Sequence, residues 1–76
     1  MSVELFHQLA DPDSAECRRA IVDLGLEGRV ALRNVFYDSH KAAFAALGGQ
    51  RVPALWSGTA LVEGKEAVLA ALSALR

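Results

Sequence analysis

The only cysteine of the chain, Cys17, lies in the short stretch PDSAEC, which begins at Pro12. A thiol reacts as its thiolate, and a free cysteine with a pKa of about 8.5 is only about 3% thiolate at neutral pH. Free N–H groups in the first turn of a helix lower that pKa. Ser14 holds this favourable position, and Cys17 lies one turn further along, where the effect fades.

The totals of the chain exclude several classes of function. A single cysteine rules out an internal disulfide, a dithiol exchange mechanism and a cysteine-rich zinc site, and His7 and His40 have no local ligand spacing. A formal net charge of -1 gives no electrostatic basis for binding nucleic acid. There is no apolar run of about 18 residues, and MSVELFHQ lacks the features of a signal peptide. We therefore expect one cytoplasmic, monomeric domain over residues 1–76, without a membrane, nucleic acid or metal partner.

Apolar periodicity predicts seven elements in the order β-α-β-α-β-β-α. VELF alternates as a strand does, and residues 30–36 are rich in strand-forming side chains. The helix between them begins either at Pro12, with Asp11 as N-cap, or after Asp13, with Glu16 completing a capping box. A helix in SHKAAFAALGG, strands in VPALWS and GTALVEG, and a last helix in GKEAVLAALSALR complete the order.

This order, in about this length, resembles the thioredoxin fold in its minimal glutaredoxin-like form. PDSAECRRA follows the first strand, where glutaredoxins carry a Pro-x-Cys-x-x-Cys-x-x-Ala pattern. On that pattern Pro12 matches the proline and Ala20 matches the alanine. Ser14 stands in the place of the nucleophilic cysteine, and Cys17 stands in the place of the second cysteine.

Two later stretches carry the same resemblance. RVPAL is similar to the Val-Pro before the third strand of glutaredoxins and glutathione transferases, whose proline is cis. The resemblance implies a cis bond between Val52 and Pro53 that presents the Val52 backbone to an extended thiol ligand. LVEGKEAV lies where glutaredoxins have Gly-Gly and an acid, and where the N-terminal domains of the transferases have Glu-Ser. Glu63 and Gly64 therefore join Pro12, Val52 and Pro53 as expected ligand-binding residues.

The resemblance implies an α/β fold, with a four-stranded mixed sheet and helices on both faces, and redox or glutathione-linked work. Glutathione or the thiol of a partner protein is the expected co-substrate, and no tightly bound cofactor is implied. The Gly-Gly pair and the first cysteine are missing, so ordinary dithiol reduction is lost. A monothiol reaction through Cys17 stays open.

Each candidate also has a purely structural alternative. Cys17 can be a small residue of the core, since free cysteine is among the most buried residue types. Ser14 can bond a backbone N–H at the helix start instead of supporting a glutathione thiolate. Glu63 can counter the dipole of the last helix instead of binding the amino group of a ligand.

Two functional hypotheses follow from these alternatives. The first is a weak redox protein with an atypical site, in which Ser14-Ala15-Glu16-Cys17 replaces Cys-x-x-Cys and Cys17 and Ser14 are catalytic. The second is a non-catalytic module that holds a peptide or thiol ligand in a groove at Pro53. The exposure and reactivity of Cys17 distinguish them.

Overall fold

The computed structural model describes residues 3–76, which contain seven elements in the order expected from the sequence. The strands are β1 (Val3–His7), β2 (Val30–Asn34), β3 (Ala54–Trp56) and β4 (Leu61–Glu63). The helices are α1 (Pro12–Asp23), α2 (Asp38–Ala46) and α3 (Lys65–Ala74). One mixed sheet has the strand order β2-β1-β3-β4, with β1 and β2 parallel and the other neighbours antiparallel. The topology is thioredoxin-like, and the predicted fold class is confirmed.

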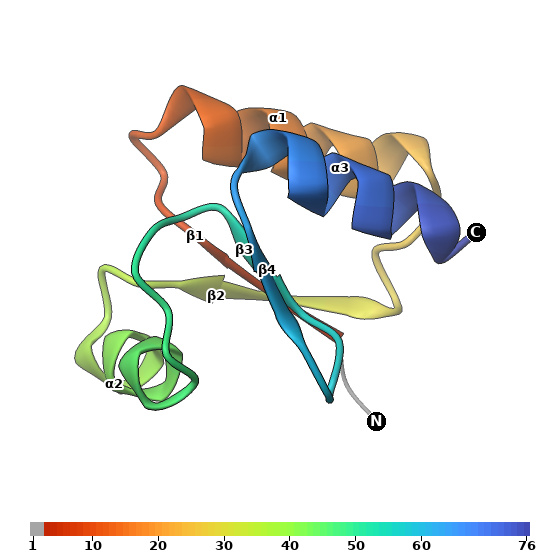
Figure 1. The fold of residues 1–76 in the computed structure, drawn as a ribbon. Coiled ribbons are helices and arrows are strands. Elements are labelled where there is room, and N and C mark those ends of the chain that lie inside the picture. Colours follow the sequence, from red (N-terminus) through yellow and green to blue (C-terminus); the bar gives the residue numbers. More distant parts are fainter. Residues whose placement is uncertain (1–2) are drawn as a thin grey trace.

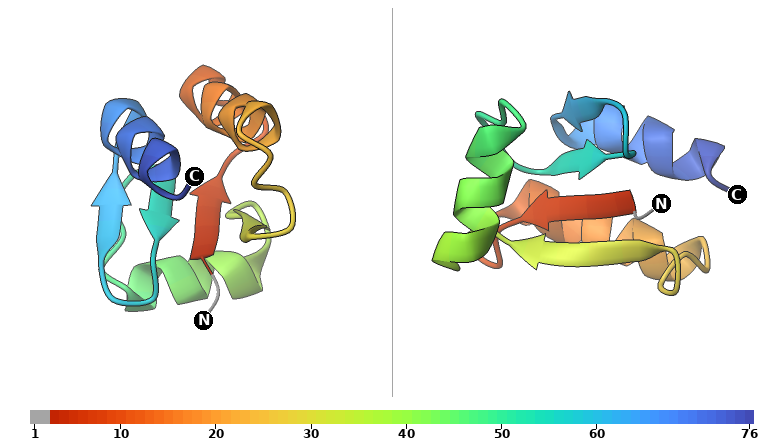
Figure 2. Two further views of the ribbon diagram at one scale, coloured as in Figure 1. Left: turned by 90° about the vertical axis from the view of Figure 1, so that its right-hand side faces the viewer. Right: turned by 90° about the horizontal axis from the view of Figure 1, so that it is seen from below.

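Helices lie on both faces of the sheet, as predicted, but they cover the faces unequally. Figures 1 and 2 show α1 and α3 side by side on one face, where they contact each other. On the other face α2 crosses the end of the sheet at which β2 finishes. The loop between β1 and α1 therefore lies at the same end of the molecule as α2.

The two faces have separate apolar clusters because neighbouring residues of a strand point to opposite faces. In β1, Leu5 packs with α1 and α3, and Phe6 packs with Phe44 of α2 at a ring-centroid distance of 5.0 Å. The first cluster contains Leu5, Cys17, Ile21, Leu26, Val30, Leu55, Val68 and Leu72. The second cluster contains Phe6, Val35, Phe44 and Ala54. Burying each large apolar side chain contributes about 1.5–3 kcal/mol, so α1 and α3 hold the larger share of the core.

The start of α1 follows the first of the two predicted caps. Asp11 is the N-cap, and its carboxylate accepts a hydrogen bond from the Ser14 N–H, with Pro12 as the first helical residue. The alternative capping box is wrong: the Asp13 and Glu16 carboxylates instead approach Lys65 at the start of α3. Proline fits the first position because its missing N–H would have no partner inside the helix.

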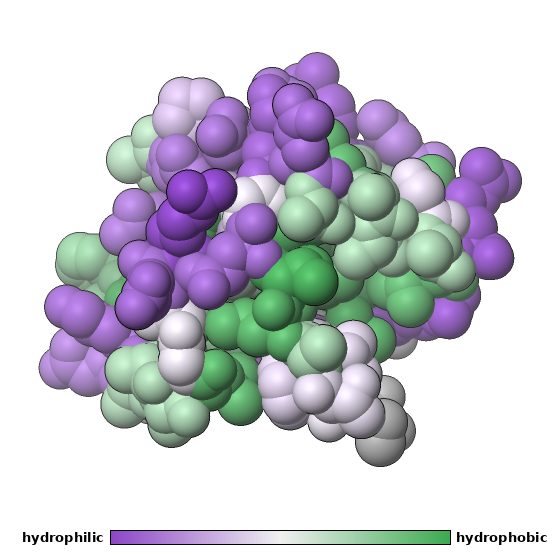
Figure 3. All heavy atoms as spheres, viewed as in Figure 1, coloured by the Kyte–Doolittle hydropathy of each residue, from purple (hydrophilic) through white to green (hydrophobic). Residues whose placement is uncertain are grey.

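The surface of the α1 and α3 layer differs from that of the sheet edge. In Figure 3 hydrophilic side chains cover the upper part of the view, where α1 and the start of α3 lie, and much of the left part, where α2 and the loop before β3 lie. Hydrophobic side chains gather at the centre, over the β3–β4 hairpin. Within residues 3–76, no helix is both long and apolar enough to cross a bilayer.

Replacing Gly49 with alanine should destabilise the protein by about 1–3 kcal/mol, which is the usual effect of overpacking a core. A Cβ atom built on Gly49 would overlap the ring of Phe44, which is itself packed on Phe6 and has little room to move. Gly28→Ala is the matched control, because a Cβ there meets nothing within 4 Å. Chemical denaturation of both variants measures the difference, and equal midpoints would contradict the prediction.

Candidate functional site

The structure brings the three predicted ligand-binding segments to one end of the sheet. Phe6 pairs with Ala54 and Ala54 pairs with Glu63, so the residues just beyond these pairs meet at one end of the strands. They are the loop that leads to Pro12, the Val52–Pro53 bond, and the turn at Gly64. These three segments form the candidate site, which we call the Val52 edge.

Cys17 lies beneath this edge rather than on it. Its side chain is 0% exposed and belongs to the cluster between the sheet, α1 and α3. The pKa of the Cys17 thiol is raised to about 11, mainly by burial and also by the nearby Glu16 and Asp13 carboxylates, while Lys65 lowers it by less. The sulfur is therefore a neutral, enclosed thiol at neutral pH, which is how a core cysteine behaves.

Ser14 is also fully buried, and its hydroxyl is held by two neighbours. The Ser14 Oγ donates to the Asp11 Oδ2 at 2.8 Å and accepts a hydrogen bond from the Gln8 N–H at 3.2 Å. These are the contacts of a helix-start serine that satisfies a backbone N–H. A ligand thiolate at this hydroxyl would have to displace one of them.

The hydrogen bonds of Gln8 explain why the ladder between β1 and β3 stops. Continuing the register of Phe6 with Ala54 would place Gln8 opposite Val52. The Gln8 N–H donates to Ser14 instead, and its carbonyl accepts from the Asp11 N–H at 3.3 Å and from the Arg18 side chain at 3.1 Å. Among residues 3–76 no hydrogen bond involves the backbone N–H or carbonyl of Val52. Val52 therefore presents a free donor and a free acceptor.

The bond between Val52 and Pro53 is cis, as the resemblance implied. Pro53 is buried, and its carbonyl accepts a hydrogen bond from the Gly64 N–H at 2.9 Å. Gly64 has a φ of 97°, and a Cβ there would lie 2.7 Å from the Arg51 guanidinium. Glycine is needed at this turn for its backbone angle, since the exposed Arg51 side chain could move away from a Cβ atom.

Glu63 has a role that the sequence did not suggest. Its Oε1 accepts hydrogen bonds from the Gln50 N–H at 2.9 Å and from the Arg51 N–H at 2.7 Å. Hydrogen bonds to a carboxylate are among the stronger ones in proteins, so Glu63 fixes the loop that leads to Val52. The predicted contact of Glu63 with a ligand stays a prediction.

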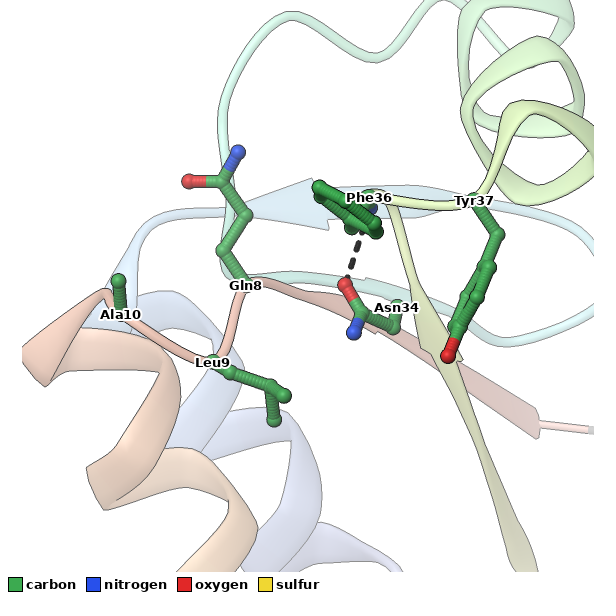
Figure 4. A pocket seen from close by; sticks show the side chains of 6 residues that line it. All are labelled: Gln8, Leu9, Ala10, Asn34, Phe36 and Tyr37. Atoms are coloured by element: carbon green, nitrogen blue, oxygen red, sulfur yellow. Dashed lines mark hydrogen bonds between the residues drawn. The ribbon is translucent and has the colours of Figure 1, made fainter.

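Two neighbouring cavities open beside this edge. The larger has a volume of about 770 Å³, and Val52, Phe44 and Lys41 are among the residues that line it. The smaller has a volume of about 460 Å³ and lies between the β1–α1 loop and the segment after β2, as Figure 4 shows. Gln8 and Phe36 line both cavities. Of the predicted site residues, Val52 alone lines either of them.

His7 and Arg18 form a buried polar contact behind the Gln8 loop. His7 is 4% exposed, and its Nδ1 lies 3.1 Å from the Arg18 Nη1. Since a guanidinium can only donate, this nitrogen accepts the hydrogen bond and carries no proton. Burial lowers the pKa of His7, and the positive charges of Arg18 and His40 lower it further.

Acidification from pH 7.5 to pH 5.5 should therefore destabilise the folded protein. The stabilising contribution of neutral His7 is complete above its unfolded pKa of about 6.5 and is lost as the pH falls through its lower folded value. Urea denaturation across this range measures the effect. A His7→Gln variant should lose most of this pH dependence, and His40→Gln should keep it. Identical slopes in the two variants would contradict the assignment to His7.

Lys65 and Gln8 are positioning residues that the sequence did not suggest, and Asp11 was expected only as a helix cap. The Lys65 Nζ lies 3.5 Å from the Glu16 Oε1 and 4.0 Å from the Asp13 Oδ1, so it joins α3 to α1 above Cys17. The sequence gives no sign of this role for Lys65, because its partners are about 50 positions away in the sequence. Only Asp11 carried a signal, as the first of the two possible caps.

Comparisons with known proteins add no family to the thioredoxin-like topology. Neither a protein-family model nor a curated protein matches this chain. Residues 3–76 also hold no group of three or more His, Cys, Asp or Glu side chains that could bind a metal ion.

Proposed function

We propose that this protein is a non-catalytic binding module of thioredoxin-like fold that holds an extended peptide segment, with or without a thiol, at the Val52 edge. The observation that carries the proposal is that the backbone N–H and carbonyl of Val52 have no hydrogen-bond partner among residues 3–76, while Val52 lines a cavity of about 770 Å³. An extended chain supplies the complementary donor and acceptor, as in other cases of strand addition to a sheet.

The surroundings of Val52 favour a binding role. Gln8, the natural partner of Val52 in the ladder, is bonded to Ser14 and Arg18, so it does not compete with a ligand. Glu63 fixes the preceding loop through two backbone amides, which reduces the entropy lost when a ligand orders it. The backbone of Val52 is thus unpaired, and the loop before it is already ordered.

The state of Cys17 gives no support to thiol exchange. An attacking thiol must be accessible and at least partly ionised, whereas Cys17 is enclosed and its pKa is raised to about 11. Redox work through Cys17 and Ser14 remains an untested prediction from the resemblance, and no contact in the site favours it over binding.

Peptides selected from a phage-displayed random library, and then synthesised, are the first probes of this function. On titration into ¹⁵N-labelled protein, they should shift the Val52 amide resonance and slow its hydrogen exchange. A library that enriches no peptide, or peptides that leave the Val52 amide unchanged, would overturn the proposal.

Chemical synthesis allows a direct test of the Val52 N–H, because the chain has 76 residues and Cys17 is a ligation point. Replacing the amide N–H of Val52 with an ester oxygen should weaken peptide binding about fivefold, corresponding to about 1 kcal/mol for one hydrogen bond. An ester at Gly28 is the matched control: no hydrogen bond involves that amide among the described residues, and it lies in the loop before β2.

Experiments with glutathione distinguish peptide binding from redox chemistry at the same site. If the site holds only a peptide backbone, reduced glutathione and S-methylglutathione should produce equal shifts at Val52. If oxidised glutathione instead forms a mixed disulfide with Cys17, detected by intact mass, and releases one reduced glutathione, and if methylation of reduced glutathione abolishes its binding, the redox function would be established.

A further inference from the structure

The two cavities form one continuous surface with an apolar part and a basic part. Leu9, Phe36 and Tyr37 border the smaller cavity and are 68%, 80% and 58% exposed. In Figure 4 the side chains of Leu9 and Tyr37 lie on the two sides of Asn34, with Phe36 above it. Phe36 also borders the larger cavity, so a ligand lying along Val52 reaches the apolar part across this ring.

Two cations and one carboxylate line the larger cavity, so its lining has a net positive charge. Lys41 and Arg51 line it, and within residues 3–76 neither side chain forms a salt bridge. The one carboxylate that lines it, Asp11, already accepts two hydrogen bonds from Ser14. The nearby Glu63 carboxylate is bound to backbone amides. Among the described residues, Lys41 and Arg51 are thus without an ion-pair partner, and the hydrogen bonds of Asp11 and Glu63 hold these carboxylates on other groups.

We infer that the bound segment is an acidic peptide, in which a Glu or Asp side chain pairs with Lys41 and Arg51 and a bulky apolar side chain packs among Leu9, Phe36 and Tyr37. The inference rests on the proposed function and names the ligand of the same edge. The two basic side chains favour a negatively charged ligand, and the exposed apolar and aromatic side chains supply the apolar contact.

Fluorescein-labelled peptides on a serine–alanine background test this specificity. One position carries Glu, Gln or Lys, a second position carries Leu or Ala, and the spacing between the two positions is varied. Fluorescence anisotropy should rank the Glu–Leu peptide first, and its affinity should fall as salt is added, because exposed charges are screened.

Charge reversal at Lys41 tests whether this residue binds the Glu side chain of the peptide. Lys41→Glu should weaken binding of the Glu–Leu peptide about fivefold to tenfold and transfer the preference to the Lys–Leu peptide. Arg19→Glu makes the same change in net charge on an exposed α1 residue outside both cavities, so it should leave the ranking unchanged. Phe36→Ser should remove the preference for Leu over Ala without affecting the preference for Glu.

The outcomes separate this inference from the proposed function. If Glu, Gln and Lys peptides bind equally and all shift the Val52 amide, the edge is a peptide site and the inference about charge is wrong. If Lys41→Glu and Arg19→Glu have equal effects, the charge preference is non-specific and the inference is also wrong. If no peptide reaches the Val52 amide, the proposed function itself fails.

Discussion

Cys17 should react with iodoacetamide at pH 7 at least about a hundredfold more slowly in the folded protein than in the unfolded chain. A thiol with a pKa of about 11 is only about 0.01% thiolate at pH 7, compared with about 3% for a free cysteine. The enclosure of the sulfur by α1, α3 and the sheet slows the reaction further. Mass spectrometry of timed samples, with and without guanidinium chloride, gives both rates.

The pH dependence of the same reaction is the stricter measurement. The native rate should rise up to about pH 11, and a Cys17→Ser control should show no labelling at all. A native rate close to that of the unfolded chain, with an apparent pKa below about 8.5, would contradict the buried state and revive the redox hypothesis. Slow labelling would leave the Val52 edge as the place to look for function.

Asp11→Ala should destabilise the protein by about 2–4 kcal/mol and lower its Tm by at least about 8 °C. Two effects combine in this variant. The start of α1 loses its cap, and the buried Ser14 hydroxyl loses its acceptor. Thermal and urea denaturation measure the change.

Asp11→Asn is the matched control for this prediction. An asparagine keeps an oxygen that can accept from the Ser14 N–H and Oγ, and it is as good an N-cap as aspartate, so only a few tenths of a kcal/mol should be lost. Equal losses in the two variants would show that the charge of Asp11, rather than its acceptor, stabilises the helix start.

The fold could be predicted because its signals are local. Alternation in β1 sends Leu5 and Phe6 to opposite faces, and Pro12 after Asp11 marks the start of α1. The site was predicted less completely, because its contacts join distant segments. The burial of Cys17 depends on Val68 and Leu72 of α3, and the sequence does not say which helix will cover which part of α1.

The details at the Val52 edge show the same limit. The bond at Pro53 was expected from the resemblance, whereas the free Val52 backbone results from Gln8 being drawn toward Ser14. The contact of Glu63 with the Arg51 amide likewise requires the β3–β4 hairpin to be formed first. Hydrogen bonds of this kind follow from the assembled fold and leave no periodic pattern in the sequence.

The position of β1 has a consequence for the order in which the molecule can assemble. β1 is the first element of the chain, yet it lies inside the sheet between β2 and β3. During synthesis from the N-terminus, β2 can pair with one side of β1 soon after it emerges. The other side stays open until β3 (Ala54–Trp56) has been synthesised, so until then a nascent chain exposes an unpaired strand edge, which is prone to aggregate.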